Sequence, residues 1–508
     1  MVIAGVFMVT LMGCAAYPAL PARPTSLAPG ATASPASGAA ISAMDPSWVK
    51  AENAKRGTAD WRIPASRVPN DHALAGYADH TSVLRGEDVG LYITSTLGAY
   101  SVAAYRVGDY GGLGGRLVWR SGTIPGIGQP KEALTAEHMV TTTWSRSASV
   151  STAGWPAGLY LFKVSAASAD TYIPLTVRDP QSAGRVVIVD SVATRQAYNQ
   201  WGGYSLYRGP DMAYADRSRI VSFDRPYDNN GEGDGSSSVN DQVRYLESLG
   251  LNLGYVTSTD LDVDPAVLDG AAAVVSLAHD EYYSVAMRAN LERSVAAGTN
   301  LAYLGGNGVY WRVRFGSSPL GIERVMMGYR QMTEDPLKDD PQTTTMWRGA
   351  PMARPESSLL GVQYACIAGH APLVVLDPGF WAWAGTGVTA GATIPGLIGQ
   401  EVDAIAPTSP VGLQVVGHSP VACRGGRTIY ADTTYYTTPG GAGVFAAGSI
   451  LWTRAWAGTN GSWGITADTV AFARQVAQNI LSAFSQPRAG ARLPARGNLR
   501  ELGLAPAG

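Results

Sequence analysis

The chain has 508 residues, of which 46% are hydrophobic and 15% charged, so it is long enough for two or three folded domains and too apolar to be disordered as a whole. Its formal net charge at pH 7 is −2, and it contains no basic run or base-reading motif, so the sequence predicts no nucleic-acid partner. The 60 glycines and 31 prolines indicate many turns.

Residues 1–14 form an apolar run that ends in Leu-Met-Gly-Cys, which resembles a bacterial lipoprotein signal in which Cys14 becomes the lipidated first residue. We therefore expect an exported protein of the cell envelope, held on the membrane by a lipid anchor at Cys14. Residues 15–60 begin with a stretch rich in Pro, Ala, Ser and Gly, which predicts a flexible linker. In an oxidising compartment the two remaining cysteines, Cys366 and Cys423, favour a disulfide over a metal site.

Residues 61–180 contain six or seven short runs of alternating apolar and polar residues, separated by Gly and Pro. This spacing predicts a β-sandwich of immunoglobulin-like type. Such domains usually bind or act as spacers. By its local pattern Tyr160 is an ordinary strand aromatic.

From residue 184 to residue 486 strand-like and helix-like segments alternate, which predicts an α/β domain with a doubly wound parallel sheet of flavodoxin-like or glutamine-amidotransferase-like type. Residues 317–442 are rich in Pro and Gly with scattered β-like runs, which indicates a β-rich insertion. Residues 487–508 are expected to be a disordered tail. The fold class predicted for the whole chain is thus all-β followed by α/β.

Polar side chains follow the strands of this predicted sheet. The apolar run 272–278 predicts a buried strand, and His279 and Glu281 come directly after it; Tyr198 and Asn307 also follow strands. Ligands bind at the carboxyl ends of such strands, so we expect these side chains to face one crevice. No cysteine or Gly-x-Ser-x-Gly frame accompanies them, so a carboxylate or imidazole would carry the chemistry. The alternative is a helix cap beside a structural histidine.

Two other patterns are weaker. Residues 228–241 are acidic and rich in Gly, but Val239 stands where a calcium-binding loop of the EF-hand type needs its twelfth-position Glu. The paired glycines after Trp201 and before Asn307 do not form the Gly-x-Gly-x-x-Gly pattern, so the sequence predicts no dinucleotide cofactor.

Several motifs follow one another along the chain, at residues 196–207, 221–227, 245–247, 260–261, 279–284 and 304–315. Their order resembles that in the C-terminal domain of the large subunit of N,N-dimethylformamidase and its relatives. The resemblance is strong from about residue 155 to 315 and weaker from 443 to 484.

The resemblance implies a mononuclear iron site of two tyrosines and one glutamate that hydrolyses an amide. Carried over by motif, the glutamate is Glu281 and the tyrosines are Tyr198 and Tyr160, with Tyr204 as a further candidate for either tyrosine. Three anionic oxygen ligands suit Fe(III). The resemblance also leaves open whether the chain forms a homo-oligomer or binds a small partner subunit.

Adjacency suggests further roles near Glu281. His279 could act as the base that takes a proton from water, and Asp280 or Asn307 could orient the substrate or a ligand. Tyr283 stands where the relatives commonly have Trp, and Arg195 where an aromatic residue is common, so the pocket is expected to differ in shape.

The sequence therefore predicts an iron-dependent hydrolase of a small amide, with Tyr160, Tyr198 and Glu281 as metal ligands and His279 and Asn307 assisting. Two alternatives stay open. One is a non-catalytic cell-envelope lipoprotein that binds a carbohydrate or peptide in the α/β crevice. The other is a metal-free hydrolase in which His279 and Glu281 act as acid and base.

Overall fold

The computed structural model describes residues 47–69, 72–233 and 239–504. The predicted signal and the lipidation site at Cys14 lie outside these residues. In the part of the chain that is described, no helix has the length and apolar character needed to cross a membrane. Helix α1 (Trp48–Asn53) lies inside the stretch expected to be a linker, and its Trp48 and Val49 are buried, so the folded part begins earlier than predicted.

The N-terminal strands form two sheets around a shared apolar core. Their orders are β1-β3-β8 and β2-β10-β9-β4-β5. Buried side chains of both sheets, such as Leu91, Val102 and Phe162, pack in one cluster. The strands are β1 (Leu74–Ala78), β2 (Ser82–Leu84), β3 (Asp88–Ser95), β4 (Ser101–Val107), β5 (Gly115–Arg120), β8 (Ala148–Ser151), β9 (Gly158–Ser165) and β10 (Asp170–Arg178), with a separate pair β6 (Ala133–Leu134) and β7 (Val140–Thr141).

The second part is built on a seven-stranded sheet of order β13-β11-β14-β16-β23-β22-β21. The first five strands are parallel, whereas β22 and β21 join antiparallel. The strands are β11 (Val186–Asp190), β13 (Leu253–Thr257), β14 (Ala273–Ala278), β16 (Asn300–Gly305), β21 (Gln414–Ala422), β22 (Thr428–Thr437) and β23 (Gly443–Ala446). The expected parallel sheet is thus a mixed sheet, extended by two strands of the predicted insertion.

Helix α5 shows how the helices join this sheet. Ser284 accepts a hydrogen bond from the backbone N–H of Met287 at 3.0 Å and so caps the helix. Met287 and Leu291 then pack in the same buried cluster as Val274 of β14. The α-helices here are α2 (Val192–Tyr198), α3 (Asn240–Ser248), α4 (Ser258–Val263), α5 (Val285–Ala296), α6 (Ser357–Leu360), α7 (Ala467–Phe484) and α8 (Ala489–Arg492).

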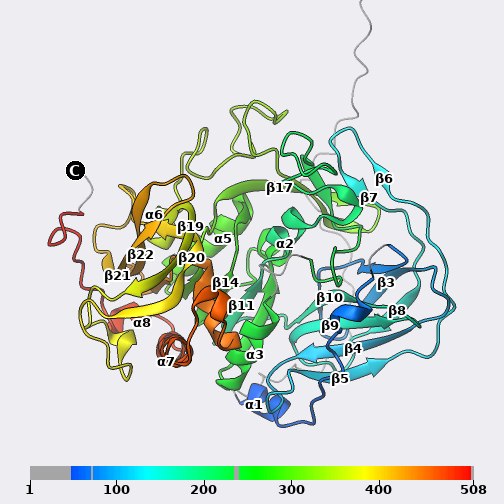
Figure 1. The fold of residues 1–508 in the computed structure, drawn as a ribbon, viewed down its shortest axis with the longest axis horizontal. Helices are drawn as coiled ribbons and strands as arrows, with labels where there is room; N and C mark the ends of the chain where they lie inside the picture. The colour runs from blue at the N-terminus through cyan, green and yellow to red at the C-terminus, as the bar shows by residue number, and fades with distance from the viewer. Residues whose placement is uncertain (1–46, 70–71, 234–238, 505–508) are drawn as a thin grey trace, which may run out of the picture. The chain divides into compact units, whose positions relative to one another are not determined.

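Two smaller sheets complete the described chain (Figure 1). One has the order β12-β18-β17-β15, and the other pairs β19 with β20. Their strands are β12 (Ile220–Ser222), β15 (Tyr282–Ser284), β17 (Trp311–Ser318), β18 (Gly321–Met327), β19 (Gln363–Val374) and β20 (Thr393–Ala404), and the short 3₁₀ helices are η1 (Ala65–Arg67), η2 (Trp201–Gly203), η3 (Trp381–Trp383), η4 (Ile450–Ala457) and η5 (Gly461–Trp463). The C-terminal segment expected to be disordered contains α8 and the buried Leu499. A mixed α/β chain of several sheets is therefore confirmed, while the immunoglobulin-like and flavodoxin-like assignments stay predictions.

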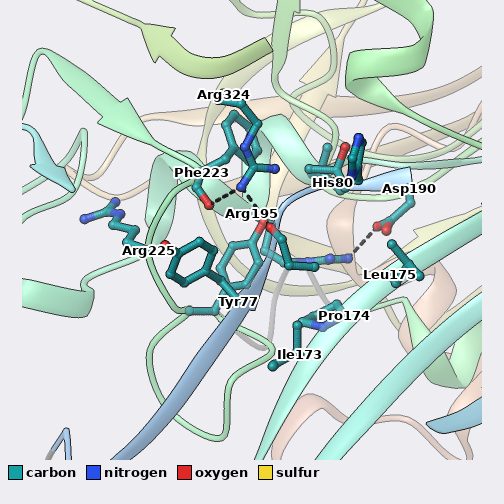
Figure 2. Close-up of a pocket in the computed structure, with 14 residues that line it drawn as sticks. Tyr77, His80, Ile173, Pro174, Leu175, Asp190, Arg195, Phe223, Arg225 and Arg324 are labelled. Carbon is teal, nitrogen blue, oxygen red and sulfur yellow. Dashed lines mark hydrogen bonds and ion pairs between the residues drawn. The ribbon is translucent and has the colours of Figure 1, made fainter. Parts of the chain in front are cut away.

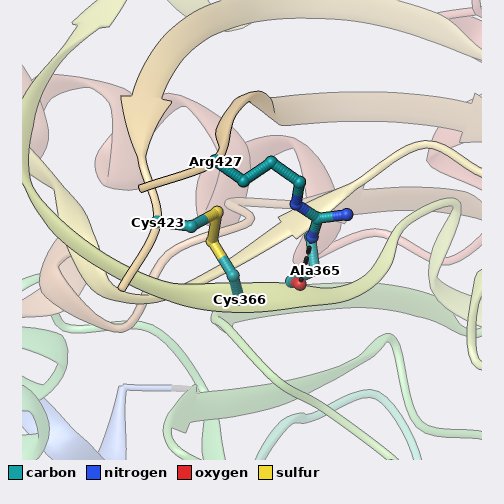
Figure 3. Close-up of a disulfide and its surroundings, with 4 residues drawn as sticks. All are labelled: Ala365, Cys366, Cys423 and Arg427. Atoms are coloured by element: carbon teal, nitrogen blue, oxygen red, sulfur yellow. Dashed lines mark hydrogen bonds between the residues drawn. A yellow bond between two sulfur atoms is a disulfide. The ribbon is translucent and has the colours of Figure 1, made fainter. Parts of the chain in front are cut away.

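A disulfide joins Cys366 on β19 to Cys423, just after β21 (Figure 3). Beside it the Arg427 side chain donates to the carbonyl of Ala365 at 3.3 Å. The predicted pairing of the two cysteines is thus present. It fixes the β19–β20 ribbon to the edge of the large sheet.

A small cavity lies where strands β1 and β10 meet the α/β part (Figure 2). The space in it that is open to the centre of a water molecule is about 30 Å³, which is room for a few water molecules. Its charged side chains are already engaged, because Arg195 pairs with Asp190 and Arg324 donates to the carbonyl of Phe223 at 2.8 Å. This cavity is therefore a small feature of the junction between the two parts.

Candidate functional site

Glu281 is placed by the turn that follows β14. Ala278 has a left-handed backbone (φ +54°), which bends the chain away from the strand. The backbone N–H of Glu281 then donates to the hydroxyl of Thr194 on α2 at 2.9 Å. Glu281 is only 2% exposed. The turn therefore holds a buried carboxylate between the end of a parallel strand and a helix.

Two tyrosine hydroxyls converge on this carboxylate. Tyr198, at the end of α2, donates to Oε2 of Glu281 at 2.9 Å. Tyr207, in the following loop, lies 2.6 Å from Oε2 and 2.9 Å from Oε1. The two phenol rings stack with centroids 4.2 Å apart. Three oxygen-bearing side chains thus meet at one point.

A second carboxylate and an imidazole adjoin the first. Nε2 of His279 lies 3.5 Å from Oε2 of Glu281 and 3.0 Å from Oε2 of Glu401, which β20 supplies. Nδ2 of Asn307 donates to Glu281 at 3.2 Å and to Glu401 at 2.9 Å. His279 and Asn307 therefore each link the two carboxylates. The side chain of Glu401 is 19% exposed, against 3% for Glu281, so Glu401 is the more accessible of the two carboxylates.

Burial sets the protonation of these groups. Burial raises the pKa of Glu281, and the charge of Glu401 adds to the rise while His279 opposes it. For Glu401 burial also acts upward, but its hydrogen bond and attraction to His279 leave the pKa below its ordinary value. Burial, followed by the nearby Glu281 charge, raises the pKa of both Tyr198 and Tyr207 well above the usual range. Without a cation the two phenols keep their protons and donate to Glu281.

These residues fit a hard metal ion. Within residues 47–69, 72–233 and 239–504, no group of three or more His, Cys, Asp or Glu side chains is suited to a metal. Tyrosine is outside that set of ligand types, and here two phenols share a carboxylate with distances below 3 Å. Replacing the two phenol protons by one highly charged cation would leave three anionic oxygen ligands, the donor set that suits Fe(III). Among the described residues, Tyr198, Tyr207 and Glu281 are the ones that would hold it.

The structure brings together four of the residues predicted from sequence, namely Tyr198, His279, Glu281 and Asn307. It does not bring Tyr160 to them. The Tyr160 hydroxyl donates to the carbonyl of Pro156 at 2.5 Å, and its ring stacks on Trp155 inside the sandwich core. Alternate residues of β9 face the sandwich core, and Tyr160 is one of them. The structure therefore does not place Tyr160 where a metal ligand of the cluster would have to lie, contrary to the position carried over from the family motif.

Tyr204, the further candidate, packs against a different cluster, which contains Trp144 and Trp201. Its ring contacts that of His138 at 5.0 Å. Asp280 faces away from the carboxylate pair, since its Oδ2 accepts from Ser276 at 2.8 Å and from Tyr283 at 2.6 Å. Asp280 thus supports the turn.

Sequence reasoning missed Tyr207 and Glu401. Tyr207 ends the motif 196–207, nine residues after Tyr198, so its motif was visible although its role was not. Glu401 lies 120 residues after Glu281, within the insertion, and has no local pattern that marks it. A third group, Arg330, lies with its guanidinium 4.0 Å from the Tyr207 ring and 4.3 Å from the Trp311 ring.

The fold and the site define an α/β protein with a buried cluster of phenols, carboxylates and imidazole at the ends of parallel strands. The chain belongs to the N,N-dimethylformamidase beta subunit-like, C-terminal family, whose family model matches residues 101–462. The match begins at β4 of the sandwich and ends past η4, so it contains every residue of the cluster. A comparison with individual curated proteins gave no match.

Proposed function

We propose that the chain hydrolyses the C–N bond of a small amide at the cluster of Tyr198, Tyr207, Glu281, His279 and Glu401. Family membership supports a hydrolase similar to N,N-dimethylformamidase. The observation that carries the proposal is the convergence of two phenol hydroxyls on one buried carboxylate, beside an imidazole that reaches a second carboxylate.

The proposed cofactor is one Fe(III) ion held by Tyr198, Tyr207 and Glu281. When bound, it supplies Lewis acidity that polarises the carbonyl of the amide. The protein's own proton-binding group is the pair of His279 and Glu401, because Nε2 of His279 lies 3.0 Å from Oε2 of Glu401, close enough for a proton to pass between them. Asn307 keeps both carboxylates in place by bridging them.

The chemistry then balances with water as the second reactant. Water adds to the carbonyl carbon and loses a proton to the His279–Glu401 pair. The pair returns that proton to the amide nitrogen as the C–N bond breaks. The products are a carboxylic acid and an amine. Burial of His279 and Glu281 keeps bulk water from competing for these hydrogen bonds.

The test uses matched tyrosine variants of the purified protein. We expect about one iron per chain and a visible absorption band, because tyrosinate bound to ferric iron gives a charge-transfer colour that free tyrosine lacks. Tyr198→Phe and Tyr207→Phe should each lose the band, most of the iron and the hydrolysis of a panel of small formamides and acetamides. Tyr160→Phe removes a tyrosine hydroxyl from the core of the sandwich, away from the cluster, and should keep all three.

Other results decide between the alternatives. A protein that stays colourless after reconstitution with iron, yet hydrolyses amides and loses this activity in His279→Gln, would replace the iron site with acid–base catalysis. A metal-free protein that hydrolyses nothing and binds an oligosaccharide or peptide would be a binding lipoprotein. Export and a lipid anchor at Cys14 are proposed from residues 1–14 alone, and membrane fractionation of a Cys14→Ser variant would check them.

A further inference from the structure

Asp403 is a buried carboxylate that the proposed chemistry does not use. It is fully buried on β20, two residues after Glu401. Its Oδ1 accepts the backbone N–H of Asn307 at 2.8 Å. Its Oδ2 is buried and has no hydrogen-bond partner among the described residues.

Asn307, its partner, has a left-handed backbone. Its φ is +55°, a conformation that is uncommon for residues with a side chain and that Asn adopts more readily than most. The loop around it is pressed against β20, because a Cβ on Gly306 would lie 2.7 Å from the carbonyl oxygen of Glu401. This conformation sends the Asn307 amide towards Glu281 and Glu401.

Strand geometry explains how β20 holds both ends of Asn307. Residues two apart on a strand point to the same face, so Glu401 and Asp403 face the loop together. Glu401 accepts from the side-chain amide of Asn307, and Asp403 accepts from its backbone. The two contacts therefore hold Asn307 both by its side chain and by its backbone.

The energetics argue that Asp403 does not serve stability. A carboxylate with one oxygen unpaired loses its hydration without full compensation, and the neighbouring Glu401 carries the same charge. An apolar side chain of similar size would avoid this cost. A group that lowers stability and lies beside a reactive cluster usually helps to position the reacting side chains.

We propose that Asp403 is a positioning residue that holds Asn307 in its left-handed conformation, so that the Asn307 amide keeps Glu281 and Glu401 at their working separation. The inference rests on the proposed function for its kinetic consequence only. Its structural consequence, the place of the Asn307 amide, is independent of any reaction.

The test compares Asp403→Leu with Asp403→Asn. Leucine keeps the volume and removes the acceptor, so kcat for the best amide should fall about 10- to 100-fold with KM little changed, as for other residues that orient reacting groups. Asparagine keeps an oxygen that accepts from the Asn307 N–H and should restore most of kcat. Neither variant should lower the melting temperature appreciably, because leucine leaves the Asn307 N–H without an acceptor but also removes a carboxyl with one buried, unpaired oxygen, and the two effects oppose each other.

Asp79→Leu is the matched control. Asp79 is also a buried aspartate that accepts a backbone N–H, from Gly90 at 2.9 Å, but it lies in the sandwich. This variant should lose melting temperature and keep kcat at temperatures where it is folded. An Asp403→Leu protein that fails to fold, or that loses as much melting temperature as Asp79→Leu, would assign Asp403 a structural role and overturn the proposal.

Crystal structures of the two Asp403 variants separate this inference from the proposed function. In Asp403→Leu the Asn307 amide should leave one or both carboxylates, and in Asp403→Asn it should keep them. If Asn307 is unmoved in Asp403→Leu, the positioning role is wrong even where the wild type is an amidase. If the wild type hydrolyses no amide, the position of Asn307 still decides the matter.

Discussion

At the scale of single residues, burial makes the Asp403 carboxyl a pH-sensitive group. Burial raises its pKa from 3.8 to about 7, with the charge of Glu401 adding to the rise and the N–H of Asn307 opposing it. The folded protein therefore binds the Asp403 proton more tightly than the unfolded chain does. The cost of ionising Asp403 in the folded state is absent below about pH 4 and complete above about pH 7.

We therefore predict that Asp403→Asn becomes more stable relative to the wild type as the pH rises from 4 to 7. Each unit of the pKa difference is worth about 1.4 kcal/mol, so the gain reaches a few kcal/mol and is constant above pH 7. Urea midpoints of both proteins, measured at half-unit steps from pH 4 to 8, check it. A difference that does not change with pH would show that Asp403 titrates as an exposed carboxyl does.

Some residues of the site could be predicted from the sequence and others could not. His279, Glu281 and Asn307 were predictable because each comes soon after a buried strand, and the strand ends of one sheet lie together. Tyr198 stands at the end of α2, the helix that follows β11, and its motif marked it. For Tyr160 the local β pattern indicated a core aromatic, which is where its side chain lies, and only the carried-over motif suggested a ligand. Glu401 reaches the site through tertiary packing of a distant ribbon, which no local pattern encodes.

At the scale of elements, the β19–β20 ribbon is the part of the insertion that completes the site. Strand β20 supplies both Glu401 and Asp403, and its pairing with β19 fixes their register. The sequence indicated β-like runs here but gave no sheet partner. Pairing partners depend on tertiary contacts that short alternating runs leave unspecified, and for the same reason β21 and β22 were assigned to an insertion although they extend the large sheet.

The disulfide of this ribbon leads to a prediction about stability. Cys366 and Cys423 are 57 residues apart in the sequence, and closing a loop of that length in the unfolded chain is worth up to about 4 kcal/mol. The double variant Cys366→Ser/Cys423→Ser should lower the urea midpoint accordingly. Reductant should lower the midpoint of the wild type and leave that of the double variant unchanged.

Iron content gives the specific control for the disulfide. The three expected ligands lie on α2, the loop after it and the turn after β14, none of which the disulfide touches. The double variant should therefore keep its iron at temperatures where it is folded. Loss of iron without loss of stability would show that the ribbon takes part in metal binding.

At the scale of the whole described chain, a buried charge network joins the sandwich to the α/β part. Arg106 of β4 pairs with Glu247 of α3, and both side chains are fully buried. Glu247 also accepts from Asn53 of α1 at 2.8 Å and from Tyr255 of β13 at 2.5 Å. Helix α1 packs beside α3 (Figure 1). Helix α1, within the stretch expected to be a linker, therefore takes part in the contact between the two parts.

This network predicts that the two parts unfold together and that either charge alone is harmful. Arg106→Met and Glu247→Leu each leave one buried charge without its partner, which should cost about 3 to 5 kcal/mol. The double variant removes both charges and should lose clearly less than the sum of the two single losses. Asp241→Asn, which removes a half-exposed pair with Arg244 on the same helix, should cost less than about 1 kcal/mol.

Calorimetry of the wild type, Arg106→Met, Glu247→Leu and the double variant distinguishes the possible outcomes. The wild type should show one unfolding transition, because the Arg106–Glu247 pair makes the folding of each part depend on the other. The single variants should show an earlier transition of the sandwich, separate from that of the α/β part. If the single losses simply add in the double variant, Arg106 and Glu247 act independently, and the joint between the parts must then come from the apolar contacts and the smaller hydrogen bonds around them.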